Sequence, residues 1–405
     1  MSAHDPPVRP SSRPVFGWET ILFLSVVTAL EALAIDMYLP AFPAVADAFQ
    51  ATPGAVQQTL SVFLIGLGLG QGLYGYFLDR HGRRIPLLAG MGLFVAGTAA
   101  VALAPPLQWM LMARFVQAIG AAAGLVAPRA IIRDECDVQT SARLLSILMQ
   151  VMTIGPILAP ILGDTLLGLA GWRSIFWTLA LIGMLCLVWG LRATPETLPR
   201  ERRVRHRLAS LLSAYGQQAA NPSFMAYGLA SGFTLASLFL YIAASPFVAI
   251  QHFGLTPTQF SYYFAGNAVG LIAVGQVNLW LLKTMPGRRI LAIGLAIQTV
   301  AAVLLVLAVQ LGVASAGLYL SLLALVVWAF RLVAGNLAAV TMGQVQADFG
   351  VASSLMGFLQ YVVAGAVGLL AGLASNRIAS LPVALAACGL FAWMLFARAS
   401  KAEAP

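Results

Sequence analysis

The sequence Leu78-Asp79-Arg80-His81-Gly82-Arg83-Arg84 separates two long apolar runs in the first half of the chain. In the second half, Leu282-Lys283-Thr284-Met285-Pro286-Gly287-Arg288-Arg289 separates two others. Both stretches end in Gly-Arg-Arg, and each connects the second run of a set of six to the third. Similarity at a fixed distance along a chain is the signature of a structural repeat. The two stretches therefore predict two similar halves, each built from six apolar segments.

The composition places these segments in a membrane. Of the 405 residues, 60% are hydrophobic and only 9% are charged, whereas about 25% of an average soluble domain is charged. A run of about 20 apolar residues is long enough to cross a bilayer core of about 30 Å. We expect twelve spanning helices, at approximately 18–42, 56–78, 86–104, 108–132, 142–167, 172–192, 222–250, 258–282, 288–310, 314–341, 352–375 and 379–397.

The polar segments divide the chain further. The longest of them, 193–221, carries five arginines and is interpreted as a linker between an N-terminal bundle (18–192) and a C-terminal bundle (222–397). Residues 1–17 and 398–405 are expected to be tails, the first of them disordered. The first span is too long for a cleavable signal and has no cleavage site near its end, so we expect it to be a retained helix.

The distribution of lysine and arginine predicts the orientation. With the N-terminus inside, eighteen of the 23 basic residues lie on the cytoplasmic side, and only Arg173 and Arg377 lie outside. This asymmetry follows the positive-inside rule and predicts that both termini are cytoplasmic. The same distribution accounts for the net charge of +9. Binding of nucleic acid is not expected, because the sequence has no basic patch interleaved with stacking aromatic residues.

Other classes of function have little support in the sequence. The three cysteines, Cys136, Cys186 and Cys388, have no paired spacing, so neither disulfides nor a metal site are expected. Neither HExxH nor GxSxG occurs, which disfavours an enzyme, and the absence of a P-loop pattern argues against ATP as the energy source. A sensor would need a sizeable soluble output domain, and the longest segment outside the spans is the linker. We expect no cofactor.

Two carboxylates lie inside the first span and suggest coupling to protons or cations. A charged residue at the centre of a membrane span costs roughly 2.5–3.5 kcal/mol, so those that are present usually have a function. Glu31 and Asp36 are five positions apart, which separates them by about 140° around a helix and about 7.5 Å along it. They are not expected to face one small ligand together.

The segment Gly75-Tyr76-Phe77-Leu78-Asp79-Arg80-His81-Gly82-Arg83-Arg84 resembles the signature that the major facilitator superfamily carries between spans two and three. The resemblance implies an all-α membrane fold of twelve helices in two pseudo-symmetric bundles. It also implies a gate that stabilises the outward-facing state, with Gly75, Asp79, Arg80, Gly82, Arg83 and Arg84 as its residues. The alternative is a basic turn that only fixes the topology.

Three further stretches resemble the drug:proton antiporters of twelve spans, and among them the Bcr/CflA group of bicyclomycin and chloramphenicol exporters. They are Asp36-Met37-Tyr38-Leu39-Pro40, Arg114 to Gly124, and Gly155-Pro156-Ile157-Leu158-Ala159-Pro160-Ile161-Leu162-Gly163. The resemblance covers 18–397. Asp164 and Arg331 depart from the pattern and could alter the choice of substrate.

The resemblance implies export of amphiphilic drugs, phenicol-like or bicyclomycin-like, in exchange for protons across the bacterial inner membrane. Asp36, Glu31 and Arg114 are the candidates for proton coupling or substrate contact, although Arg114 could instead extend to the outer interface. Gly155, Pro156, Pro160 and Gly163 are expected to form a tight interface between spans. Residues proposed for the cavity are Tyr38, Tyr241, Arg331 and Asn336.

Two points stay open at this stage. An exporter or importer of a natural metabolite would show the same architecture as a drug exporter, and Asp36 cannot be separated from Glu31 as the main proton carrier. The expected partners are a small-molecule drug, protons and the lipid bilayer, without nucleic acid, and the protein is expected to be a monomer.

Overall fold

A computed structural model describes residues 17–203, 208–345, 349–374 and 378–402. Within them the chain is helical and contains twelve helical segments long and apolar enough to cross a membrane. Most of the predicted N-terminal tail, as well as Arg205, Arg207 and Arg377, lies outside the described residues.

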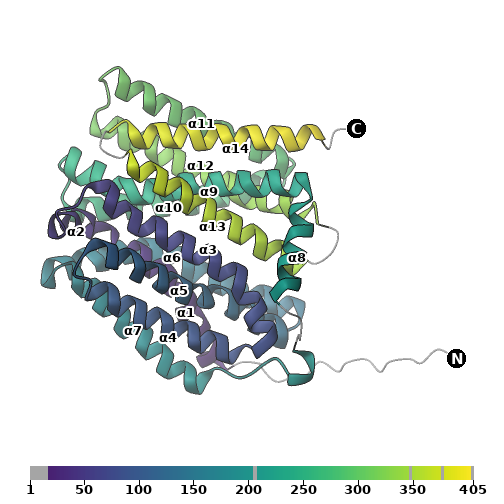
Figure 1. The fold of residues 1–405 in the computed structure, drawn as a ribbon. Helices are drawn as coiled ribbons and strands as arrows, with labels where there is room; N and C mark the ends of the chain where they lie inside the picture. Colours follow the sequence, from purple (N-terminus) through teal and green to yellow (C-terminus); the bar gives the residue numbers. More distant parts are fainter. Residues whose placement is uncertain (1–16, 204–207, 346–348, 375–377, 403–405) are drawn as a thin grey trace.

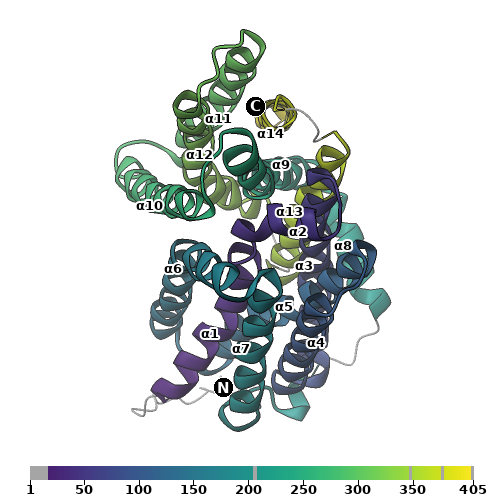
Figure 2. The same ribbon diagram turned by 90° about the vertical axis from the view of Figure 1, so that its left-hand side faces the viewer.

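The first half comprises seven helices, in which α1 and α2 together make the first span. Their bounds are α1 (Trp18–Asp36), α2 (Phe42–Ala48), α3 (Pro53–His81), α4 (Arg84–Ala102), α5 (Leu107–Glu135), α6 (Val138–Ala170) and α7 (Trp172–Ala193). The second half comprises α9 (Pro222–Pro246), α10 (Pro257–Leu281), α11 (Gly287–Gln310), α12 (Ala316–Met342), α13 (Phe349–Leu373) and α14 (Ser380–Ala402). Figure 1 shows the halves stacked on each other, and Figure 2 shows them along the helix axes.

The predicted repeat is visible in how helices begin. Thr52 caps α3 and is followed by Pro53, and Thr256 caps α10 and is followed by Pro257. A threonine hydroxyl accepts a hydrogen bond from a backbone N–H that lacks a helical partner, and proline is well tolerated in the first turn. The second span of each half therefore starts with the same local chemistry.

The first span of each half is also interrupted at its far end. After Asp36 the chain makes a 3₁₀ turn, Leu39–Ala41, before α2. After Pro246 it continues as a short π-helix, Phe247–His252. Phe42 follows the 3₁₀ turn and Phe247 begins the π-helix. Their ring centroids lie 5.8 Å apart, so the halves meet there.

The linker contains a helix that the sequence did not predict, α8 (Leu208–Ala219), which runs across the ends of the spans (Figure 1). The Tyr215 hydroxyl donates to the carbonyl of Gly72 on α3, at 2.7 Å, and Tyr215 also packs against a cluster of the second half that includes Phe224 and Leu355. The linker helix is thus attached to both halves. At the chain's other end, α14 continues to Ala402, beyond the predicted end of the last span at 397.

Two pairs of helices join the halves. Glycines bring α3 and α13 together along their length, from Gly372 beside the Gly54 carbonyl to Gly75 beside the Ser354 hydroxyl. The helices α6 and α10 meet at the ends remote from α8, where Ser261 donates to the Pro160 carbonyl at 3.3 Å.

Candidate functional site

The first carboxylate, Glu31, lies where the two halves face each other. It is on α1 and is 5% exposed. The Tyr361 hydroxyl of α13 donates to its Oε1 atom at 3.5 Å. Arg129 of α5 also interacts electrostatically with the carboxylate, but no ion pair joins the two within the described part of the chain. A buried carboxylate without a close cation is well suited to take up a proton or a cationic ligand.

The second carboxylate, Asp36, ends α1 and is 4% exposed. Tyr241 of α9, which the sequence analysis proposed for the cavity, is near enough to interact with it electrostatically. Tyr241 accepts a hydrogen bond from Asn267 Nδ2 at 3.1 Å and stacks on Phe264, with ring centroids 5.6 Å apart. Glu31 thus accepts a hydrogen bond from a tyrosine of the other half, and Asp36 lies within electrostatic range of another.

Arg114 is fully buried on α5 and does not extend to the interface. Its guanidinium lies 4.3 Å from the ring centroid of Phe63, 5.2 Å from Tyr38 and 5.7 Å from Phe176. Its Nη1 atom donates to the Ala34 carbonyl at 3.1 Å, whereas Nε and Nη2 have no hydrogen-bond partner. The guanidinium of Arg114 is thus held by cation–π contacts with three rings. The carbonyl to which it donates belongs to Ala34, two residues before Asp36 on α1. Two of its nitrogen atoms, Nε and Nη2, donate no hydrogen bond.

A short hydrogen-bond chain fixes this guanidinium. Arg114 Nη1 donates to Gln117 Oε1 at 2.7 Å, and Gln117 Nε2 donates to the Thr98 hydroxyl at 2.8 Å. All three side chains are completely buried. Because both of these hydrogen bonds are made, they hold the Arg114 guanidinium in one orientation.

The glycines of the α6 motif place this helix directly on α1. A Cβ atom at Gly163 would lie 1.9 Å from the Met37 carbonyl oxygen, and one at Gly155 would lie 3.2 Å from the Ala32 Cβ atom. Pro156 and Pro160 are inside the same helix. The close approach agrees with the predicted tight interface, and it occurs beside both carboxylates.

Asp164, which departs from the family pattern, contacts the other half. Its Oδ2 atom accepts a hydrogen bond from the Thr258 hydroxyl of α10 at 2.8 Å. This contact lies one turn from the Ser261 to Pro160 bond and adds to the closure of the halves at the end remote from α8.

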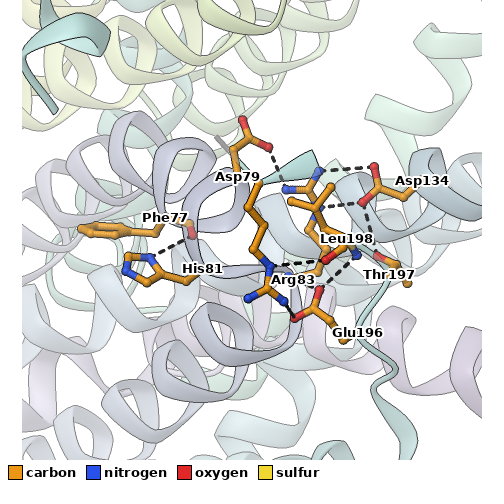
Figure 3. A network of polar contacts seen from close by, with 9 residues as sticks. Phe77, Asp79, His81, Arg83, Asp134, Glu196, Thr197 and Leu198 are labelled. Atoms are coloured by element: carbon orange, nitrogen blue, oxygen red, sulfur yellow. Dashed lines mark hydrogen bonds and ion pairs between the residues drawn. The ribbon is translucent and has the colours of Figure 1, made fainter. Parts of the chain in front are cut away.

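The signature between α3 and α4 forms a network of charges at the α8 end (Figure 3). Arg83, 3% exposed, pairs with Asp134 of α5 at 2.6 Å and with Asp79 at 2.7 Å. Burial lowers the pKa of Arg83, but the hydrogen bonds to Asp134 and Asp79 outweigh it and raise the pKa above its ordinary value. Arg83 is therefore a permanent cation that joins α3 to α5.

The linker completes the network. Glu196 Oε1 accepts the backbone N–H of Arg83 at 2.8 Å, and its other oxygen pairs with Arg203 at 3.3 Å. Gly82 makes this possible, because its φ of +91° is unfavourable for other residues and a Cβ atom there would collide with the Glu196 carboxylate. Arg84 donates to the Leu191 carbonyl, and Arg80 donates to the Tyr76 hydroxyl.

The structure shows the neighbours of three other residues that the sequence analysis proposed for the cavity. Tyr38 is fully buried in the aromatic cage of Arg114. Asn336 donates to Asn278 at 2.7 Å and to Leu332 at 2.8 Å, next to Gly287 at the start of α11. Arg331 is exposed on α12 and packs beside Gly275 of α10. Tyr241, the fourth of these residues, interacts electrostatically with Asp36.

Tyr361 and Arg129 are the residues that the candidate site contains and the sequence prediction left out. The Tyr361 hydroxyl donates to Glu31, and Arg129 interacts with Glu31 electrostatically. Arg129 was visible as a basic residue at the edge of a span, but Tyr361 had no distinguishing signal in an apolar run. Among the described residues, no cluster of three or more His, Cys, Asp or Glu side chains is arranged to hold a metal ion.

Comparison with known proteins identifies the family. The model of the Major Facilitator Superfamily matches residues 24–371. A similar solved structure is that of a bacterial homologue of the lysosomal transporter Spinster, with a TM-score of 0.74 and 18% identity over 96% of this chain and 98% of that one. The D-xylose–proton symporter gives a TM-score of 0.73 and 15% identity over 93% and 97%.

Curated relatives include proteins named for drug resistance. A bicyclomycin resistance protein homologue of Haemophilus influenzae is 28% identical over 91% of this chain and 92% of its own length. A chloramphenicol resistance protein of Pseudomonas aeruginosa is 29% identical over 72% and 70%. An uncharacterised transporter of Bacillus subtilis, YdgK, is 36% identical over 62% of this chain and 63% of its own length, so that match spans less than two thirds of the relative.

Proposed function

This chain belongs to the Major Facilitator Superfamily, and we propose that it is a proton-coupled transporter that exports amphiphilic drugs. The observation that carries the proposal is the pair of buried carboxylates on α1, Glu31 and Asp36, of which Glu31 accepts a hydrogen bond from Tyr361 of the other half. The names of the relatives support phenicol-like or bicyclomycin-like drugs as the substrate class.

The proposed exchange follows from the cost of burying charge. An empty, deprotonated carboxylate between the halves is unfavourable, and either a proton or a polar drug bound beside it relieves the cost. The carboxylates then take up protons from the outside, and drug arriving from the cytoplasm displaces them. A ligand changes the balance of inward and outward states only through its different affinity for the two.

Arg114 has a supporting role in this proposal. Its two unused donors lie near the end of α1, and a guanidinium that approaches a carboxylate favours the deprotonated form. Movement of α1 against α5 would bring the two groups closer and release the proton. The rigid hydrogen-bond chain through Gln117 keeps the arginine in place while α1 moves.

The proposed location is the bacterial inner membrane, with the chain acting as a monomer. The twelve crossings are even in number, so the two ends of the described chain lie on the same side. The excess of basic residues at the α8 end supports assigning that side to the cytoplasm.

The test is drug-induced proton movement in proteoliposomes. We would compare the unchanged protein with Glu31→Gln and Asp36→Asn, using chloramphenicol and a small cationic dye. Matched controls are Glu19→Gln and Asp47→Asn, because these carboxylates belong to the same span and are exposed. Loss of proton movement in one buried variant, with drug binding retained, would support antiport and identify the coupling acid.

The opposite results also have a clear meaning. If neither compound moves protons through the unchanged protein, drug antiport is wrong and a carrier of a natural metabolite becomes the leading interpretation, to be tested with a panel of metabolites. If both buried variants still couple drug to protons, the exchange exists but its acid lies elsewhere.

A further inference from the structure

Two arginines inside the membrane-spanning helices are exposed and have no carboxylate within ion-pair distance among the described residues: Arg129 of α5 and Arg331 of α12. Arg331 lies near the middle of its helix, which runs from Ala316 to Met342. At that depth a charged side chain faces the interior of the bundle or a water-filled cavity, because contact with hydrocarbon is costly. The neighbours of Arg331 show which space it faces.

Arg331 points away from the peripheral helix of its half. On α12, Leu332 and Val333 face α11, because both would contact a Cβ atom at Gly294 of that helix. At 100° per residue, Arg331 lies about 100° from the first and about 160° from the second around the helix. Figure 2 shows α11 on the side of α12 that is remote from the first half. Arg331 is therefore on the side of α12 that turns toward the first half.

The guanidinium of Arg331 lies over Gly275 of α10. A Cβ atom at Gly275 would be 3.4 Å from Nε and 3.5 Å from Nη2. Four helical turns comprise about 14 residues, so Gly275 shares a face of α10 with Ser261, which bonds to Pro160 of the first half. The helices α6 and α10 meet only near that serine, at the ends remote from α8. Beside Gly275 the same face opens into the space between the halves.

Arg129 reaches this space from the first half. It interacts electrostatically with Glu31 of α1 and with Tyr361 of α13. Since α13 belongs to the second half, the charge of Arg129 also lies at the boundary between the halves. An exposed guanidinium and a buried carboxylate thus face the same space from α5 and α1.

Glu31 and the guanidinium over Gly275 lie at similar depths. Asp36 interacts with Tyr241, which accepts a hydrogen bond from Asn267 of α10. Toward the end of the molecule that carries α8, Glu31 is about 7.5 Å beyond Asp36, and Gly275 is about 12 Å beyond Asn267. The difference is shorter than an arginine side chain. One carboxylate and two guanidiniums therefore share one layer of the space between the halves.

Positive charge is in excess in this layer, because a guanidinium stays protonated whatever its surroundings. Arg129 has Glu31 as its counterpart, whereas Arg331 has no carboxylate partner among the described residues. We propose that Arg331 binds an anionic group of the transported ligand, so that acidic amphiphiles are the favoured substrates. This inference rests on the proposed function, because it assigns a charge to the drug that the cavity takes.

The chemistry of the side chain defines the ligand group. The planar guanidinium donates two parallel hydrogen bonds to a carboxylate or a sulfonate, and such charge-assisted bonds are roughly twice as strong as neutral ones. A nitro or sulfonyl group, whose oxygens carry partial negative charge, satisfies the same donors more weakly. A cationic ligand is repelled by Arg331 and by Arg129.

The experiment compares three fluorescent probes that share the dansyl group and differ in charge. Near neutral pH dansylglycine is an anion, dansylamide is neutral and dansylcadaverine is a cation. Dissociation constants are measured by fluorescence on the full chain in a non-ionic detergent, with protein-free micelles as the blank. At about 0.15 M salt, exposed charges farther apart than about 8 Å are largely screened, so the net charge of the protein contributes little.

Two variants test the site, and a third is the control. Arg331→Gln removes the charge, and Arg331→Lys keeps it. Arg289→Gln is the matched control, because Arg289 is exposed at the start of α11 and has no carboxylate partner among the described residues. We expect the unchanged protein to bind dansylglycine more tightly than dansylcadaverine by about tenfold, the effect of one hydrogen bond to a charged group.

In Arg331→Gln the affinity for dansylglycine should fall by about tenfold, and in Arg331→Lys most of it should return. Dansylamide should bind all variants equally, which shows that they are folded. Tighter binding of dansylcadaverine than of dansylglycine to the unchanged protein would overturn the inference. So would equal losses in Arg331→Gln and Arg289→Gln, or the absence of binding by all three probes.

The proton measurement described above tests the proposed function separately. If chloramphenicol moves protons but the cationic probe binds best, proton-coupled export stands and the anionic ligand is wrong. If no protons move but dansylglycine binds through Arg331, the anion site stands and drug antiport is wrong.

Discussion

The Tyr361 hydroxyl of α13 lies 3.5 Å from Oε1 of Glu31 on α1, so a polar contact between the two halves involves a candidate coupling acid directly. Any movement of the halves past each other must lengthen or break this bond. The protonation of Glu31 and the relative position of the halves are therefore physically linked.

We predict that Tyr361→Phe weakens this link without unfolding the protein. The substitution removes one hydroxyl, and a hydrogen bond to a charged group contributes about 1.5–3 kcal/mol, so drug-dependent proton movement should fall by about tenfold or more. Tyr262→Phe is the control, because Tyr262 is 64% exposed on α10. Equal proton movement in both variants would show that the contact does not take part in coupling.

Two substitutions at Arg114 should separate its effects on folding and on transport. Arg114→Met removes a buried cation that has no carboxylate partner within the described residues. Replacing buried charge by an apolar side chain is often neutral or stabilising by about 1–4 kcal/mol. We expect an equal or higher unfolding temperature together with loss of coupled transport.

Arg114→Lys should show a different result. Lysine keeps the charge but lacks the planar group that contacts the three rings and Gln117. We expect both stability and transport to decrease, as measured by thermal unfolding in detergent and by proteoliposome flux. A methionine variant that transports normally would rule out a role for the cation.

Two glycines of α6 should respond in opposite directions to alanine. At Gly163 the new Cβ would collide with the Met37 carbonyl, and overpacking of this kind typically costs about 1–3 kcal/mol. At Gly168 no atom lies within 4 Å of the new Cβ, so the better helix propensity of alanine should stabilise by up to about 1 kcal/mol. Unfolding temperatures that change in the same direction would contradict the observed α1–α6 packing.

The two carboxylates that pair with Arg83 should contribute unequally to stability. The Asp134 side chain is 15% exposed and that of Asp79 is 50% exposed. Asp134→Asn should cost about 1–3 kcal/mol, because it leaves a buried charge poorly paired. Asp79→Asn should cost no more than about 1 kcal/mol. Equal losses in denaturant unfolding would show that burial does not decide the strength of this network.

Cys136 offers a test of pH dependence outside the spans. Burial, together with the negative charges of Asp137 and Glu135, raises the pKa of this thiol. Since the thiolate is the reactive form, alkylation by a maleimide should be slower than that of an exposed thiol and should accelerate only at higher pH. Asp137→Asn should move the rate profile to lower pH, and an unchanged profile would exclude the electrostatic contribution.

The sequence alone determined the architecture. Twelve apolar runs of membrane length, the repeated Gly-Arg-Arg stretches and the polar segment at 193–221 suffice because the bilayer admits helices of nearly fixed length. It also determined that Glu31 and Asp36 are unusual, since a carboxylate inside a span is costly wherever its helix packs.

Only the tertiary structure decided which residues meet these carboxylates. Helical periodicity gives the face of a residue but not the helix opposite to it, so Tyr361 could not be separated from other residues of its apolar run. For the same reason the hydrogen bond between Asn336 and Asn278 could not be predicted. The environment of Arg114, an aromatic cage and not a carboxylate, likewise depends on how α1, α3, α5 and α7 pack together.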